Sequence, residues 1–186
     1  VYLAAPNAPK TALAIGDYFA MKYDFIQSGK VEPEANQLDE STNTAMAYTH
    51  DLGNISEPTS DFVMIGYDDI ESIQYFKENR KGYWKEHGQM DIYQAFEQSA
   101  QQYEKWMNRC RRFDKQMMED ATKAGGKKYA ELCALAYRQA IAAHKLVTDK
   151  EGNLLFLSKE NFSNGSIGTV DVTYPSAPLF LLYNPD

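Results

Sequence analysis

Two helical patterns joined at Gly125-Gly126 constrain the fold of this chain more than any other feature of its sequence. Over residues 91–121, apolar side chains recur at spacings of three and four, with charged side chains between them. This spacing predicts an amphipathic helix of about eight turns with one solvent-facing side. Residues 128–147 are rich in Ala and apolar on nearly every side, which predicts a buried helix. The glycine pair predicts a stop and restart, because Gly tolerates the left-handed backbone that follows a helix end.

An outer amphipathic helix followed by a buried one is the repeating unit of an α/α toroid, and the same pattern also fits a three-helix bundle. Ahead of these helices the chain has a different texture. Loose alternation over residues 11–25 and short apolar runs at 45–49 and 62–67 predict strands, and the polar stretch 28–44 predicts a loop or weak hairpin. Two or three strands are marginal alone, so we expect the tail of a larger β domain.

The fold class expected from these patterns is therefore α+β, with residues 1–66 belonging to the β domain and residues 67–186 forming the start of the helical domain. The chain begins without Met and stops directly after the apolar run 179–183, so we expect a fragment of a longer protein. Asp68 and Asp69 predict the N-terminal cap of a short helix that ends at residues 81–82.

Composition excludes several classes of function. The 186 residues carry 19 basic and 26 acidic side chains, a net charge of −7, so nucleic acid is a poor partner. No apolar run approaches the roughly 18 residues of a membrane span. Zinc-binding, common serine-hydrolase and Walker-type motifs are absent, and the sequence indicates neither a metal nor a cofactor.

The two cysteines, Cys110 and Cys133, are expected to be free and buried. On antiparallel helices joined at the glycine pair they would be about eight residues out of register, or roughly 12 Å along the axis. A disulfide requires Cα atoms within about 7 Å of each other.

The densest group of polar residues lies in the segment 158–171, and irregular loops beside buried helices often carry functional sites. Glu160 and Asp171 are candidate catalytic carboxylates, of which one would be protonated and the other ionised. The alternative is that they cap turns or a helix terminus. On the predicted buried helix, His144 either faces a cavity as a base or ligand, or donates to a carbonyl oxygen. Arg138 on the same helix either binds a substrate carboxylate or pairs with a structural acid.

Two long runs of the chain resemble the glutaminase A-like family of secreted fungal and bacterial proteins. They are residues 129–146, YAELCALAYRQAIAAHKL, and residues 158–176, SKENFSNGSIGTVDVTYPS, and residues 67–76 fit the family more loosely. The resemblance implies an N-terminal β-sandwich followed by a six-hairpin α/α toroid of the glycosidase-like type. This chain would then hold the last strands of the sandwich and the opening hairpin of the toroid, and its partners would be the remaining domains.

The activity that the resemblance implies is hydrolysis of glutamine or a similar small amide to the acid and ammonia, by a secreted or periplasmic enzyme. For this reaction, Asp171 or Glu160 would activate water, and Arg138 would bind the substrate carboxylate. The oxyanion would be held by Asn161, Asn164 or backbone amides of the loop, with His144 and Tyr174 as further substrate-binding candidates. A carbohydrate-active enzyme and a non-catalytic interaction module are the alternatives, because fold does not settle function.

Overall fold

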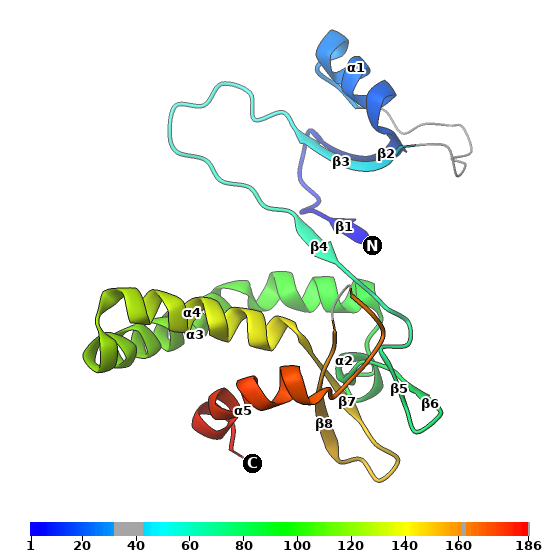
Figure 1. Ribbon diagram of the computed structural model, residues 1–186. Helices are drawn as coiled ribbons and strands as arrows, with labels where there is room; N and C mark the ends of the chain where they lie inside the picture. Colours follow the sequence, from blue (N-terminus) through cyan, green and yellow to red (C-terminus); the bar gives the residue numbers. More distant parts are fainter. Residues whose placement is uncertain (32–42, 161–162, 186) are drawn as a thin grey trace. The chain divides into compact units, whose positions relative to one another are not determined.

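The computed structural model describes residues 1–31, 43–160 and 163–185, which form two compact units, Val1–Asp68 and Asp69–Asp186. Small antiparallel sheets and longer helices alternate along the chain (Figure 1). The chain is thus α+β, as its sequence predicts. In the part of the chain that the structure describes, each sheet has two strands.

The first unit contains two strand pairs, and its predicted strands at 45–49 and 62–67 are confirmed. The longer pair runs from Thr11↔His50 to Asp17↔Thr44 and joins β2 (Thr11–Asp17) to β3 (Thr44–His50). The shorter pair joins β1 (Tyr2–Ala4) to β4 (Met64–Gly66). A small core of Ala14, Met21 and Val31 packs against Ala45 and Ala47 of β3.

The strand predicted over residues 11–25 is confirmed as far as Asp17. Beyond it the prediction is wrong, because Tyr18–Ser28 forms helix α1. The Asp17 carboxylate caps this helix by accepting hydrogen bonds from the backbone N–H groups of Phe19 and Ala20, both at 3.0 Å. Gly29, with φ of 69°, ends it in the left-handed conformation. These caps outweigh the strand preference of the aromatic residues between them. Most of the predicted loop 28–44 lies outside the described residues.

The second unit contains the predicted helix pair, α3 (Ile92–Gly125) and α4 (Lys127–Ala142), which lie side by side (Figure 1). A capping box starts α3: the Asp91 carboxylate accepts from the Gln94 N–H at 2.8 Å, and the Gln94 side chain accepts from the Asp91 N–H at 3.0 Å. The break between the helices falls at Gly126, as predicted.

Two details predicted for α4 are wrong. The helix ends at Ala142 rather than residue 147, because His144–Thr148 forms strand β7, which pairs with β8 (Leu154–Ser158) in an antiparallel hairpin. Nor is α4 enclosed on all sides. Ala130 is fully buried, but Leu132 is 61% exposed and Leu135 is 51% exposed. Pairing with β8 satisfies backbone groups that a longer helix would have satisfied internally.

The short helix predicted after Asp69 is instead a hairpin of β5 (Ile73–Tyr75) and β6 (Glu78–Arg80). It is followed by the one-turn helix α2 (Tyr83–Glu86). Asp69 does not cap a helix here: its carboxylate pairs with the Lys145 ammonium at 2.7 Å. This ion pair connects the segment before β5 to β7.

Helix α5 (Val170–Tyr183) is the last element of the described chain and has Pro175 and Pro178 in its interior. Both cysteines are free, as predicted, but neither is buried as expected: Cys110 is exposed and Cys133 is half-buried. Among the described helices, none combines the length and the apolar character needed to cross a membrane.

Candidate functional site

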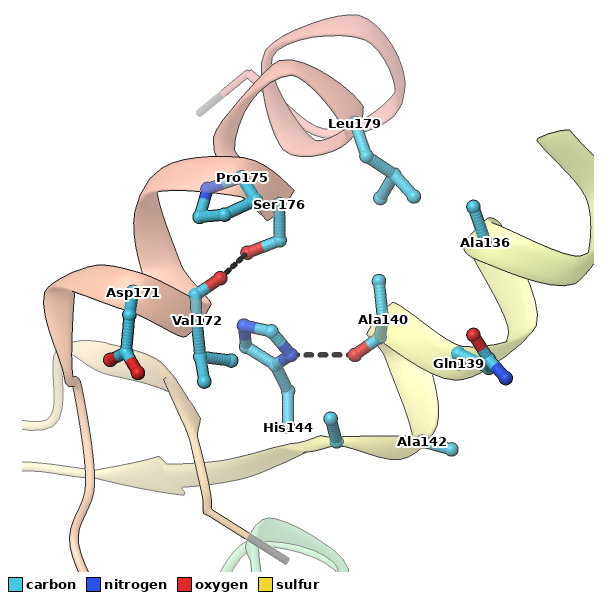
Figure 2. A pocket seen from close by; sticks show the side chains of 11 residues that line it. Ala136, Gln139, Ala140, Ala142, His144, Asp171, Val172, Pro175, Ser176 and Leu179 are labelled. Carbon is cyan, nitrogen blue, oxygen red and sulfur yellow. Dashed lines mark hydrogen bonds between the residues drawn. The ribbon is translucent and has the colours of Figure 1, made fainter. Parts of the chain in front are cut away.

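A cavity of about 670 Å³ opens where α4 ends, β7 begins and α5 passes beside them (Figure 2). Alanines and Gln139 of α4 line one side, and Asp171, Pro175 and Ser176 line the α5 side. His144, the first residue of β7, lies between the two sides. The cavity thus brings together the end of α4 and the start of α5, which are separated by more than two dozen residues in the sequence.

His144 is 8% exposed, and its ring is fixed by three contacts. The Nδ1 atom lies 2.6 Å from the Ala140 carbonyl oxygen, and the ring packs against Phe156 and Phe180 with centroids 5.0 and 4.8 Å away. Since a carbonyl oxygen can only accept, Nδ1 carries the proton, and in the neutral ring Nε2 is an acceptor. Figure 2 shows this second nitrogen on the side away from Ala140, and no described residue hydrogen-bonds to it.

Asp171 lies in the first turn of α5, at the edge of the same cavity. The start of α5 is fixed to the end of β8 by a hydrogen bond between the hydroxyls of Ser158 and Thr173 at 3.0 Å. Ser158 also accepts at its carbonyl oxygen from the Gly168 N–H at 2.9 Å. The Ser176 hydroxyl donates to the helix backbone, with the carbonyl oxygens of Val172 and Thr173 both 3.0 Å from its oxygen.

Glu160, the other predicted carboxylate, forms hydrogen bonds that hold its own loop together. Its two oxygens accept from the hydroxyls of Thr169 at 2.7 Å and Ser163 at 3.2 Å. Asn164 accepts from the Ser166 N–H at 2.8 Å in a tight turn. Among the described residues that line the cavity, neither Glu160 nor Asn164 is found.

The remaining predicted site residues are dispersed. Arg138 is exposed on α4 and Tyr174 is 79% exposed on α5, and neither lines the cavity. Asn161 lies outside the described residues. The structure therefore brings together His144 and Asp171, and the roles predicted for the other residues stay predictions.

Sequence reasoning missed Gln139, Pro175 and Ser176 as cavity residues. The sequence signal that could have found them is a helical spacing: Asp171, Pro175 and Leu179 follow one another at intervals of four residues, and all three line the cavity. The two prolines hid this pattern, since proline normally argues against a helix interior. In the part of the chain that the structure describes, no group of three His, Cys, Asp or Glu side chains is arranged to hold a metal ion.

Comparison with protein families places the chain in a known group. Residues 1–120 match a domain of unknown function (DUF5127), and residues 126–186 match the glutaminase A six helical-hairpin domain. The first match ends inside α3, five residues before its end, and the second begins at Gly126, where the chain turns from α3 into α4. The chain belongs to the glutaminase A-like family, in agreement with the resemblance seen in its sequence.

Two named relatives are fungal. The chain is 29% identical over 170 residues to Glutaminase A of Aspergillus oryzae, a match that covers 87% of this chain and 24% of the relative. It is 40% identical over 74 residues to a Probable glutaminase of Arthroderma benhamiae, which covers 40% of this chain and 8% of the relative. The chain thus spans a quarter or less of the relatives' lengths. No solved structure matches it significantly.

Proposed function

We propose that the full-length protein hydrolyses the carboxamide of glutamine, or of a similar small amide, to a carboxylate and ammonia. Family membership and relatives named glutaminase support this reaction. The observation that carries the assignment to the α4–α5 cavity is His144: its ring is buried and fixed, and no described residue hydrogen-bonds to Nε2, the ring nitrogen that does not contact Ala140. Asp171 supplies a carboxylate at the same cavity.

In this proposal His144 is the general base, in preference to Asp171 or Glu160. Its Nε2 takes a proton from water as the water oxygen attacks the carboxamide carbon, and the same proton then passes to the leaving nitrogen. The Nδ1–H bond to the Ala140 carbonyl oxygen holds the ring orientation and stabilises the imidazolium that forms. Water and the amide thereby give a carboxylic acid and ammonia, and transfer of the acid proton to ammonia yields the carboxylate and an ammonium ion.

We also propose the larger architecture and location that the family resemblance implies. The strand pairs of the first unit would belong to a β-sandwich, with the boundary near residues 66–67. Helices α3 and α4 would form the opening hairpin of an α/α toroid in a secreted or periplasmic protein. The water-activating role predicted for Glu160 passes to His144 in this proposal. The oxyanion-binding role of Asn161 or Asn164 and the carboxylate-binding role of Arg138 stay predictions that the proposal does not use, because Asn164 and Arg138 do not line the cavity and Asn161 lies outside the described residues.

The test compares the full-length protein with its His144→Asn variant. Asparagine keeps an N–H that can donate to the Ala140 carbonyl oxygen but lacks the atom equivalent to Nε2. We expect ammonia release from glutamine to fall by about 10²–10⁴-fold. His50→Asn is the matched control, because His50 also uses Nδ1 in its bond, to Asp61, and lies outside the cavity lining.

Two outcomes would contradict the proposal. One is an unchanged rate of ammonia release in the folded His144→Asn variant. The other is release of reducing sugar from oligosaccharides, with no ammonia from glutamine, which would favour the carbohydrate-active alternative.

A further inference from the structure

The strand that carries His144 is held from its opposite face by an ion pair. Successive side chains of a strand point to opposite faces of the sheet, so Lys145 leaves β7 on the face away from the His144 ring. Its ammonium lies 2.7 Å from a carboxylate oxygen of Asp69, in the segment before β5. The two side chains are 39% and 30% exposed, so the pair is partly removed from water. Two charges interact more strongly there than in bulk solvent.

A second lysine attaches β8 to the same segment. Lys159 directly follows β8, and its ammonium donates to the Ser72 carbonyl oxygen at 3.3 Å. Its backbone N–H donates to the Ala143 carbonyl oxygen at 2.8 Å. The Ser72 side chain also hydrogen-bonds to the Asp69 carboxylate. Both lysines are thus attached to one segment, next to the position of His144 in the hairpin.

The segment between these two attachments has a strained backbone. Ile70 has a φ of 60°, a left-handed conformation that is an outlier for a β-branched residue. Such a conformation persists only where the surrounding contacts fix it. The contacts of Asp69 and Ser72, on either side of Ile70, attach this segment to the β7–β8 hairpin. The segment is therefore a specific support of the hairpin.

The charge of Lys145 bears on the proposed reaction, because His144 becomes an imidazolium when it takes a proton from water. An ammonium one residue away along β7 opposes a second positive charge, and a carboxylate beside that ammonium offsets the opposition. Asp69 supplies this carboxylate. Burial raises its pKa, but the hydrogen bond and the charge of Lys145 outweigh burial and leave the pKa of Asp69 lowered. Asp69 is therefore ionised at neutral pH.

The groups that surround His144 in the described part of the chain include few charges. The two rings packed against the His144 ring are those of Phe156 and Phe180. Among the described residues that line the cavity, those of α4 are uncharged, and Asp171 of α5 is the one other titratable side chain. Lys159 lies beyond β8 and is bound to a neutral carbonyl oxygen. Lys145 is thus the cation on the strand of His144 itself.

We propose that Asp69 is a positioning residue for the proposed hydrolysis, which acts through Lys145: it fixes β7 behind His144 and offsets the ammonium charge as His144 takes up a proton. This inference rests on the proposed role of His144 as the general base. Asp69 is not among the described residues that line the cavity, so it is not expected to contact the substrate.

The first test measures ammonia release from glutamine by the full-length protein as a function of pH. Asp69→Asn keeps the shape of the side chain but leaves the Lys145 ammonium without a carboxylate. We expect the acid limb of the rate to move to lower pH by up to about one unit, because the imidazolium of His144 is then less favourable. The maximal kcat should fall by about three- to tenfold with little change in KM, since a weaker base is a slower one.

Removal of the lysine tests the sign of the effect. Lys145→Met leaves the Asp69 carboxylate without the ammonium, so we expect the acid limb to move to higher pH. The double variant, Asp69→Asn with Lys145→Met, removes both charges and should return the limb to its original position. A merely structural role of the ion pair would move the limb in none of these variants. Glu78→Gln is the matched control and should leave the profile unchanged, because Glu78 pairs with Lys150 at the far end of the β7–β8 hairpin.

A chemical label measures the same effect without the reaction. Diethyl pyrocarbonate acylates the unprotonated imidazole, and mass spectrometry of the peptide that contains His144 follows this acylation as a function of pH. In variants whose circular dichroism shows them to be folded, the midpoint of labelling should move in the same direction as the acid limb.

The inference is overturned if both midpoints stay fixed in Asp69→Asn and in Lys145→Met, or if they move the same way in both variants. Glutamine hydrolysis by those preparations would then keep the proposed function. Labelling midpoints that move as expected, in a protein that releases no ammonia, would keep the charge coupling of Asp69 to His144 and remove the hydrolysis.

Discussion

At the scale of single residues, the first unit contains a polar cluster of Tyr48, His50 and Asp61. One carboxylate oxygen of Asp61 accepts from the Tyr48 hydroxyl and faces the His50 Nδ1, both at 2.6 Å. The other accepts from the Phe62 N–H at 2.8 Å. In the sequence, the carboxylate next to His50 is that of Asp51. The carboxylate that actually contacts His50 is that of Asp61, eleven residues further along the chain, which the loop after β3 brings back to this strand. The cluster attaches this loop to β3.

Asp61→Asn is expected to return the pKa of Tyr48 from about 12 toward its ordinary value of 10.0, because the hydrogen bond to the Asp61 carboxylate is the main cause of the increase. In the same bond, the Tyr48 hydroxyl lowers the pKa of Asp61. The tyrosine contribution to stability is therefore complete below pH 10 and is lost as pH rises through about 12. The aspartate contribution is present above its ordinary pKa and is lost as pH falls through the lowered value.

Carbon-13 NMR of the tyrosine rings would follow this titration directly. Asp51→Asn is the control, because the Asp51 carboxylate bonds to the Gly53 N–H and pairs with Lys10 rather than with Tyr48. A Tyr48 pKa that stays near 12 in Asp61→Asn would show that another group raises it.

At the scale of helices and strands, the β5–β6 hairpin shows what sequence patterns miss. Its two turn residues, Phe76 and Lys77, have φ values of 46° and 67°, a left-handed conformation that Asn and Gly adopt far more easily. Without an Asn-Gly or similar signal, the apolar spacing around them suggested a helix. The helices over residues 91–142 were predictable, because many residues in a long periodic pattern each favour a helix. Helix α5 was not, because its two prolines argue against a helix.

Lys77→Gly is expected to stabilise the second unit by about 0.5–1 kcal/mol, because glycine relieves the left-handed strain of the turn. The same substitution at Lys105, an exposed position inside α3, is expected to destabilise by about 1 kcal/mol, since glycine is a poor helix residue. Urea unfolding followed by circular dichroism would measure both changes. Opposite signs for one substitution test the backbone conformation itself, and a loss of stability at both positions would contradict the turn geometry.

At the scale of the whole molecule, the candidate site was only half predictable. His144 and Asp171 were selected as chemically capable residues, but their meeting at one cavity depends on β7 turning away from α4 and on α5 forming despite its prolines. No local pattern encodes those two events. The predicted enclosure of α4 is not found, since its apolar side chains Leu132 and Leu135 are 61% and 51% exposed.

If further hairpins cover α4 in the full-length protein, as the proposed toroid requires, Leu135→Asn should change stability little in residues 1–186 and strongly in the full-length protein. In residues 1–186 alone, where Leu135 is 51% exposed, we expect a change in stability within about 0.5 kcal/mol and weaker binding of a hydrophobic dye. In the full-length protein the same change would place a polar group in a packed interface and cost about 2–5 kcal/mol, seen as a lower thermal midpoint. Lys128→Asn, also exposed on α4, controls for the helix preference of Asn. Equal, small effects in both chains would show that this face of α4 stays open to solvent and that the hairpins do not close over it.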